Sequence, residues 1–123
     1  MNLNDLALDI YAGNVKRGFY EQPVEFGTRI ALIHSEASEV LEAHRKGRIA
    51  AFGAAFNTIN EKGKLCDPAL FVADVKDTVQ DELADIIIRV LDLCAHEKYD
   101  IDAHIRAKIA FNATRPYKHG KAY

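Results

Sequence analysis

The sequence predicts an all-α domain, and three observations support this fold class. Apolar residues recur at helical spacing in several long segments. Extended stretches of alternating apolar and polar residues are absent, as are hairpin turns such as Asn-Gly or Asp-Gly. The 123 residues contain no internal repeat, linker or low-complexity segment, so we expect a single domain over residues 1–123.

Composition narrows the function classes. A hydrophobic content of 49% and a charged content of 28% are ordinary for a globular protein. The net charge of -2 gives no general reason to expect nucleic-acid or membrane-surface binding. No apolar run approaches the ~18 residues of a membrane span, and the N-terminus lacks a signal-peptide pattern. Cys66 and Cys94 have neither metal-ligand spacing nor the density of a disulfide scaffold, which favours a reducing cytoplasm. Cys94 lies in an apolar register and is expected to be a small core residue.

The first helix is expected over residues 2–17, with Asn2 or Asn4 as its cap and Gly18 ending it. Its apolar stripe consists of Leu3, Leu6, Ala7 and Ile10. The loop that follows carries two adjacent aromatic residues, Phe19 and Tyr20. They could form a stacking surface for a nucleobase, since aromatic faces suit any base. The alternative is packing, with Phe19 filling the core and Tyr20 covering it.

The second helix is expected from about residue 24 to residue 46, and Gly47 is a suitable residue to end it. Its main apolar face comprises Phe26, Ile30, Ile33, Ala37 and Val40. Beside that face runs a stripe of Leu32, Glu36, Glu39 and Ala43. A solvated face would be more uniformly polar, so the two carboxylates in this stripe are candidate functional residues.

Residues 48–76 are expected to contain short helices. Ile49, Phe52, Phe56 and Ile59 suggest one amphipathic turn or short helix. Asp67 and Pro68 form a sensible N-cap and first residue of another. Asp77-x-x-Gln80 resembles a capping box for the next main helix.

The third main helix, ending near residues 96–98, combines an apolar side with carboxylates. Val79, Leu83, Ile86, Val90 and Leu93 fall on its apolar side. Glu82 lies at the border of that side, and Asp85 and Arg89 continue an ionisable stripe beside it. Residues three apart are neighbours on a helix surface, so Glu82 and Asp85 can converge on one point. Like charges beside an apolar seam are costly unless a cation lies between them, and a hard divalent cation prefers oxygen ligands.

Two such helices packed side by side would present Glu36, Glu39, Glu82 and Asp85 to one pocket. Four carboxylates are enough for one or two Mg²⁺ ions, and Mn²⁺ is an expected substitute.

A fourth helix is expected to begin at Asp100 or Asp102 and to stop at Pro116. One line along it begins apolar and turns polar: Ile101, Ile105, Lys108, Asn112 and Arg115. Either the helix frays into solvent there, or the line enters the carboxylate pocket, where cations would meet phosphates.

The ordered pair Glu36-x-x-Glu39 and Glu82-x-x-Asp85 resembles the metal signature of the MazG-like superfamily of all-α nucleoside triphosphate pyrophosphohydrolases. The flanking segments HSEASEVLEAHRKG, DELADIIIRVLDL and KIAFNATRPYKHGK resemble that superfamily too, and together they cover about a third of the chain. One departure is the 42 residues between Glu39 and Glu82, more than the family usually inserts there. We interpret residues 48–76 as an enlarged connection, which in a dimer could serve as interface or lid.

The resemblance implies a four-helix bundle that hydrolyses nucleoside triphosphates, ribo or deoxyribo, at the α–β bond to a monophosphate and pyrophosphate, in nucleotide-pool house-cleaning. It implies that the four carboxylates bind metal and act in catalysis. The substrate contacts that it implies are Lys108, Asn112, Arg115 and Lys118, with Phe19 and Tyr20 near the base. Ser35 stands where related enzymes sometimes carry a further Glu, so no general base is assigned. A single copy of so thin a bundle would expose apolar faces, so we expect a homodimer or homotetramer.

Three alternatives remain open from the sequence. A phosphoribosyl-ATP pyrophosphohydrolase would share the superfamily fold and chemistry. A carboxylate-bridged di-iron bundle would need Glu-x-x-His pairs, whereas this chain has Glu-x-x-Glu and Glu-x-x-Asp. A non-enzymatic helical oligomerisation module would carry solvated acidic stripes, and its stability would be indifferent to Mg²⁺.

Overall fold

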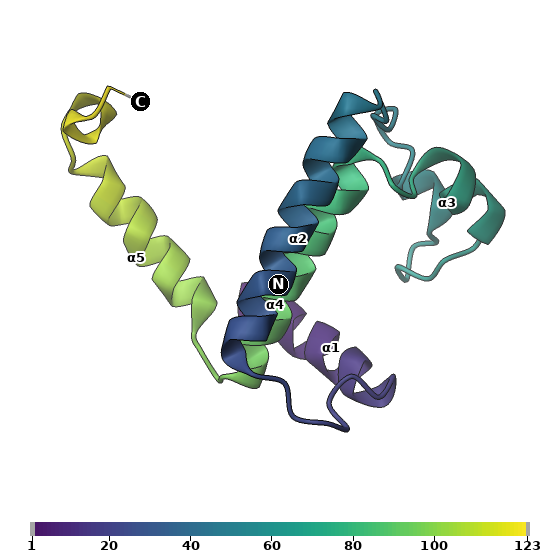
Figure 1. Cartoon of the computed structure of the whole chain (residues 1–123), viewed down its shortest axis with the longest axis horizontal. Coiled ribbons are helices and arrows are strands. Elements are labelled where there is room, and N and C mark those ends of the chain that lie inside the picture. The colour runs from purple at the N-terminus through teal and green to yellow at the C-terminus, as the bar shows by residue number, and fades with distance from the viewer. Residues whose placement is uncertain (1, 123) are drawn as a thin grey trace. The chain divides into compact units, whose positions relative to one another are not determined.

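The structure is a computed structural model that describes residues 2–122 and is all-α over that range, as the sequence predicts (Figure 1). The α-helices within this range are α1 (Leu3–Lys16), α2 (Phe26–Arg45), α3 (Pro68–Asp74), α4 (Val79–His96) and α5 (Ile101–Ala113), and two 3₁₀ helices are η1 (Phe56–Thr58) and η2 (Tyr117–Gly120). Within residues 2–122 there is no β-strand, and the β-type pairing is an isolated bridge between Ile59 and Leu65. None of the helices in that range is both long and apolar enough to cross a membrane.

The chain divides into two compact units. The first consists of Met1–Pro23 and Leu91–Tyr123, and the second is Val24–Val90. The boundary falls inside α4, so the first turns of that helix belong to the second unit and its last turns to the first.

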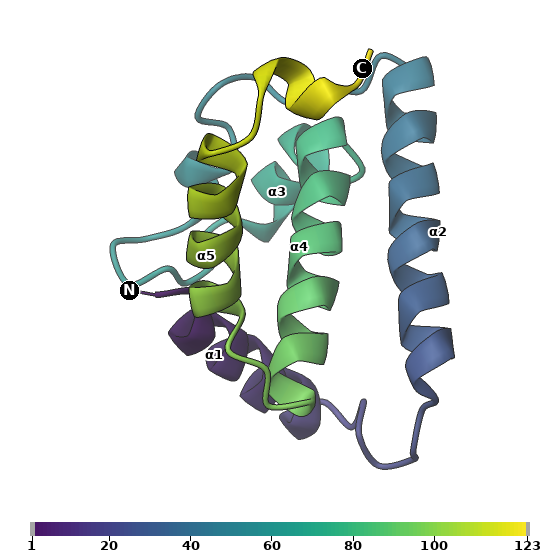
Figure 2. The same ribbon diagram turned by 90° about the vertical axis from the view of Figure 1, so that its left-hand side faces the viewer.

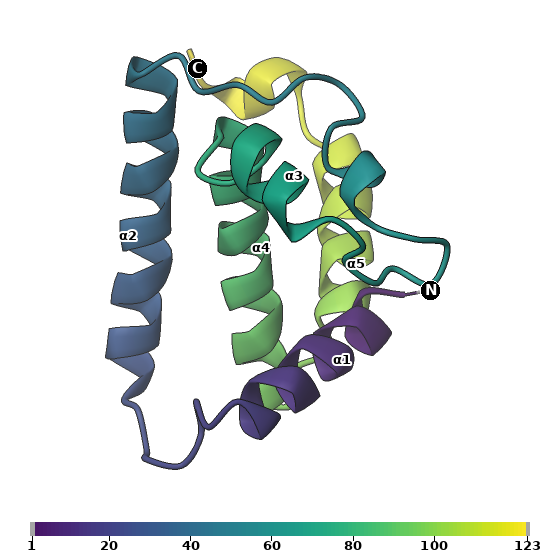
Figure 3. The same cartoon turned by 90° about the vertical axis from the view of Figure 1, so that its right-hand side faces the viewer.

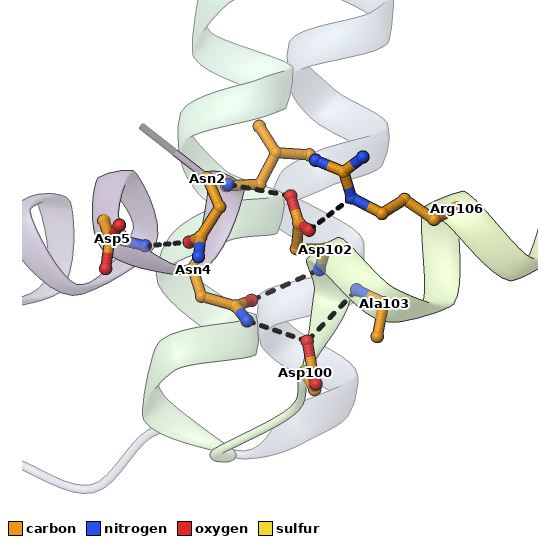
Figure 4. A network of polar contacts seen from close by, with 8 residues as sticks. Asn2, Asn4, Asp5, Asp100, Asp102, Ala103 and Arg106 are labelled. Atoms are coloured by element: carbon orange, nitrogen blue, oxygen red, sulfur yellow. Dashed lines mark hydrogen bonds and ion pairs between the residues drawn. The ribbon is translucent and has the colours of Figure 1, made fainter.

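In the first unit, polar side chains cap the N-termini of α1 and α5 and connect the two helices (Figure 4). The Asn2 side chain accepts the Asp5 N–H at 2.9 Å, which confirms Asn2 as the cap of α1. Asp100 caps α5 by accepting the Ala103 N–H at 3.1 Å, and the same Oδ1 accepts the Asn4 amide at 2.7 Å. One carboxylate oxygen therefore serves both helices.

Asp102 makes a second connection at this junction. Its Oδ1 accepts the Leu3 N–H at 3.0 Å, and its own N–H donates to Asn4 Oδ1 at 3.2 Å. Its Oδ2 accepts the Arg106 Nε–H at 2.7 Å. The buried apolar residues of this unit are Ala7, Leu91, Leu93 and Cys94, and the burial of Cys94 confirms its predicted place in the core.

In the second unit, α2 lies antiparallel alongside the part of α4 that ends at Val90 (Figures 2 and 3). The Arg89 Nε–H of α4 donates to Glu36 Oε1 of α2 at 2.5 Å, which ties the two helices together. The residues that face each other here are the carboxylate stripes. Glu36 and Glu82 are only 6% and 8% exposed, whereas Leu83, predicted on the main apolar side, is 45% exposed. The other residues predicted on that side are half-buried (Val79, Ile86 and Val90) or buried (Leu93), so Leu83 is its exposed member.

Residues 48–76 contain the expected short helices, although one lies differently from the prediction. Asp67 caps α3 by accepting the Leu70 N–H at 3.0 Å, as predicted. The amphipathic segment predicted from Ile49, Phe52, Phe56 and Ile59 is reduced to η1, and the rings of Phe52 and Phe56 are exposed. The segment is closed instead by main-chain bonds, because Cys66 N–H donates to the carbonyl of the buried Thr58 at 2.8 Å.

The predicted capping box of α4 is wrong by one residue. Asp77 has a positive φ of 61°, and the Gln80 amide bonds both the N–H and the carbonyl of Ala50 at 2.9 and 3.0 Å. Thr78 Oγ1 instead accepts the Asp81 N–H at 3.3 Å, and Asp81 Oδ2 accepts the Asp77 N–H at 2.9 Å. Gln80 thus bonds the distant Ala50 and not Asp77, the local partner that its spacing suggests.

Candidate metal centre

Three carboxylates from two helices converge in the second unit. Glu36 of α2 and Glu82 and Asp85 of α4 each offer an oxygen, and these oxygens lie within 4.8 Å of one another. Glu82 and Asp85 share one side of α4 because they are three residues apart. Glu36 reaches them from α2, and Asp85 is half-buried. The structure therefore brings together three of the four predicted metal ligands by direct geometry.

The fourth predicted ligand, Glu39, follows Glu36 by three residues on α2 and is exposed. A hydrogen bond to Glu36, and then the negative charge of that residue, raise the pKa of Glu39 to about 7. The charges of Glu82 and Asp85 act in the same direction. Glu39 is thus electrostatically part of the same group, and we call these four residues the carboxylate centre.

Glu82 and Asp85, the two carboxylates that α4 contributes to the carboxylate centre, have no hydrogen-bond donor within residues 2–122. Burial, followed by the charge of Asp85, raises the pKa of Glu82 above its ordinary value. Burial, followed by the charge of Glu36, raises the pKa of Asp85 as well. Within residues 2–122 neither carboxylate has a hydrogen-bond or ion-pair partner. Buried negative charge of this kind is unfavourable unless a cation or a proton neutralises it.

Arg89 supplies part of that neutralisation. Burial by itself raises the pKa of Glu36, but hydrogen bonds from Glu39 and Arg89 outweigh it and leave the pKa below its ordinary value. The sequence placed Arg89 on the ionisable stripe without a role. Its distance of seven residues from Glu82 and four from Asp85, two turns and one turn of helix, was the signal that it faces the same centre.

A second acidic group extends from the carboxylate centre and was not identified from the sequence. Asp77, Asp81 and Glu82 also offer oxygens within 4.8 Å of one another. Asp77 forms an ion pair with Lys76 at 3.0 Å, and Asp81 accepts the Asp77 N–H. Because two of these three carboxylates already have protein partners, the carboxylate centre is the stronger candidate for a cation.

The donor set of the carboxylate centre fits a hard divalent cation. Three of its side chains offer carboxylate oxygens within 4.8 Å of one another, which is the chemistry that Mg²⁺ and Mn²⁺ prefer, and Glu39 adds a fourth carboxylate three residues after Glu36 on α2. It contains no His or Cys among the described residues, which disfavours the di-iron alternative. A cavity of about 190 Å³ lies beside it and is lined by Glu39, Glu42, Ala43, Arg48, Asp77 and Glu82.

The predicted phosphate contacts lie in the first unit. Lys108 and Arg115 both approach the Phe111 ring, with Nζ and Cζ at 5.4 and 5.9 Å from its centroid. The buried Oδ1 of Asn112 has no hydrogen-bond partner within residues 2–122. Lys118 is exposed after the helix, with Nζ 5.8 Å from the Tyr117 ring. These residues gather around aromatic rings, and their contact with phosphate remains a prediction.

The two aromatic residues before α2 have different environments. Tyr20 stacks on His96 at 4.7 Å, meets Tyr11 edge-on at 4.8 Å, and donates its hydroxyl to Asp92 at 2.5 Å. Phe19 is 64% exposed. Tyr20 is therefore a packing residue, as one of the two predictions from the sequence has it. The same prediction placed Phe19 in the core, and that part was wrong. Phe19 has the exposure that a stacking surface would need.

Compared with known proteins, the chain matches no family model, no curated protein and no solved structure. The fold and the site define an all-α protein with a partly buried carboxylate centre between two antiparallel helices.

Proposed function

We propose that the chain is a Mg²⁺-dependent nucleoside triphosphate pyrophosphohydrolase of the MazG-like superfamily. It would cleave ribo- or deoxyribonucleoside triphosphates at the α–β bond, giving a monophosphate and pyrophosphate. The observation that supports this most is the convergence of Glu36, Glu82 and Asp85 within 4.8 Å. These residues belong to the two motifs on which the resemblance depends.

Within this proposal, the carboxylate centre holds the cation. When bound, Mg²⁺ or Mn²⁺ neutralises phosphate charge and makes a bound water more acidic. Arg89 is a positioning residue, because its bond to Glu36 orients one ligand, as partners of metal ligands generally do. Lys108, Arg115 and Lys118 would bind the phosphates by charge and Asn112 by its amide. Phe19 would be available to stack on a base.

We also propose that the protein acts as a homodimer or homotetramer in the cytoplasm, with the four-helix bundle of the superfamily. Exposed large apolar residues on α2 and α4 support association: Leu32, Leu41, Leu83 and Ile87. The same residues favour the second candidate, a helical oligomerisation module without activity. The two candidates differ in their response to Mg²⁺, because a module has no differential affinity for the ion. A phosphoribosyl-ATP pyrophosphohydrolase would differ in its substrate preference.

The deciding experiment is pyrophosphate release from a panel of ribo- and deoxynucleoside triphosphates and phosphoribosyl-ATP, in Mg²⁺ or in EDTA. We expect Mg²⁺-dependent release with the monophosphate as co-product. Glu39→Gln and Glu82→Gln should lower kcat/KM by at least about 100-fold, since losing even an outer partner of a metal ligand costs 10–100-fold. Glu61→Gln is the matched control, because Glu61 is exposed and lies outside the carboxylate centre. Release that is unaffected by EDTA, or by both variants, would refute the proposal.

A further inference from the structure

The enlarged connection between α2 and α4 lines a cavity of about 660 Å³ in the second unit, and this cavity is broadly open to solvent. Its apolar lining includes Ile49, Ala51, Ala54 and Val72, and its charged lining consists of Arg48, Lys76, Asp74 and Asp77. Pockets that bind small organic molecules have about 300–1,000 Å³ and combine apolar walls with a few polar groups. This cavity has the size of a small-molecule site, and its lining is more polar than apolar, which suits a ligand that itself carries polar groups.

The cavity adjoins the carboxylate centre. Arg48 and Asp77 line it and also line the smaller cavity, whose other residues include Glu39 and Glu82. A ligand that lies in the larger cavity can therefore extend past Arg48 to the carboxylates. A molecule with an uncharged, partly polar end and an anionic chain that reaches Arg48 matches this succession of surfaces.

Main-chain bonds hold the cavity wall against the helix that carries Glu82. The Arg48 carbonyl accepts the Val79 N–H at 2.8 Å, at the first residue of α4. Ala50 bonds Gln80 through both its N–H and its carbonyl. Residues 48–50 are thus fixed to the first turn of α4, so the position of the wall relative to Glu82 is set by these bonds.

Arg48 stands out among the charged residues of the cavity. Its side chain is exposed and has no hydrogen-bond or ion-pair partner in the described part of the chain, whereas Lys76 is paired with Asp77 at 3.0 Å. An unpaired guanidinium between two cavities is suited to bidentate contact with phosphate oxygens.

We infer that the 660 Å³ cavity binds the nucleoside end of a nucleoside triphosphate and that Arg48 contacts its phosphate chain. This inference rests on the proposed pyrophosphohydrolase function and deepens it. It gives residues 48–76 the role of a substrate-binding wall. It assigns the nucleoside to residues of the enlarged connection, whereas the resemblance implies Phe19 and Tyr20.

The test fills the cavity and compares substrates with and without a nucleoside. Ala54→Leu and Ala51→Leu should each raise KM for nucleoside triphosphates by about tenfold or more, the scale on which a pocket discriminates single carbon groups. Inhibition by inorganic tripolyphosphate, which has no nucleoside, should keep its Ki in both variants. Ala55→Leu is the control, because Ala55 is exposed and does not line the cavity. Ala51 is exposed, so its variant remains informative if Ala54→Leu does not fold.

A second pair of variants tests Arg48. Arg48→Gln should raise both KM and the Ki of tripolyphosphate, because both ligands carry the phosphate chain, whereas Arg45→Gln on the exposed end of α2 should change neither. If the wild type is active but cavity filling leaves KM unchanged, this inference is wrong and the proposed function stands. If the wild type releases no pyrophosphate from any triphosphate, both are refuted.

Discussion

The molecule has two groups of acidic residues with opposite electrostatics. At the junction of α1 and α5, Asp100 and Asp102 accept hydrogen bonds, and their pKa values lie below the ordinary value. The main causes are the Asn4 side chain for Asp100 and the Arg106 side chain for Asp102. In the carboxylate centre, burial and neighbouring carboxylates raise the pKa values of Glu82 and Asp85.

This difference separates acidic residues whose oxygens the fold supplies with donors from those that it leaves without one in the described residues. The aspartates at the junction have their oxygens occupied by N–H donors, and folding is what supplies those donors. Glu82 is buried with no donor in the described chain, so folding makes its charge less favourable. Proteins tolerate such a cost at functional sites, where binding a ligand offsets it.

The largest expected effect is stabilisation by Mg²⁺ through the carboxylate centre alone. At a concentration 100 times the Kd, a bound ion should stabilise the wild type by about 2.7 kcal/mol. The shift in Tm between Mg²⁺ and EDTA should disappear in Glu82→Gln and persist in Asp102→Asn. Thermal unfolding of the three proteins measures it. If Mg²⁺ leaves the Tm of the wild type unchanged, or if Glu82→Gln keeps the shift, the carboxylate centre does not differ from the junction of α1 and α5 as a cation site.

The next largest effect is that, without metal, substitutions in the two groups should change Tm in opposite directions. In EDTA at neutral pH, Glu82→Gln should raise Tm by a few degrees, because an amide removes a buried charge from its like-charged neighbours. Asp100→Ala should lower Tm, because the Ala103 N–H and the Asn4 amide lose their acceptor. Asp100→Asn is the matched control and should lose less, since its amide oxygen can still cap the helix. If Glu82→Gln and Asp100→Ala change Tm in the same direction, the two acidic groups do not have opposite electrostatics.

The pH dependence of stability should also run in opposite directions. Folding raises the pKa of Glu39 from 4.5 to about 7, so the folded state binds the Glu39 proton more tightly than the unfolded chain does. The stability that this proton contributes is fully present below pH 4.5 and is lost as the pH rises through about 7. Asp100 and Asp102 have lowered pKa values, so their contribution is present above the ordinary Asp pKa of 3.8 and is lost as pH falls below it. In EDTA, Tm should therefore decline between pH 4.5 and 7 in the wild type. A Glu39→Gln variant should show a smaller decline, and an identical profile would count against Glu39 as its source.

The sequence predicted those features that depend on spacing along one helix. The caps Asn2 and Asp67, the helix-ending Gly47 at φ 68°, and the shared side of Glu82 and Asp85 all follow from neighbours within four residues. Their physical basis is local, because a helix places residues three and four apart side by side regardless of the rest of the fold.

Features that depend on distant partners were not predictable in this way. Gln80 pairs with Ala50 and Arg89 with Glu36 because the fold brings together segments 30 and 53 residues apart. The exposure of Leu83 could not be predicted from spacing either, since Ile86 and Val90 on the same side of α4 are half-buried. Periodicity identifies the sides of a helix, but only tertiary packing decides which side is buried.

The smallest expected effect distinguishes the two partners of Asp102. Arg106 donates to its Oδ2 from a side chain that is 75% exposed, and exposed pairs of this kind are screened by water and salt. The Leu3 N–H donates to the other oxygen at the first residue of α1. Arg106→Gln should therefore leave Tm unchanged within error, whereas Asp102→Ala should lower it, both measured in low and high salt. If Arg106→Gln lowers Tm as much as Asp102→Ala and salt abolishes both losses, the junction depends on charge pairing and not on its main-chain hydrogen bonds.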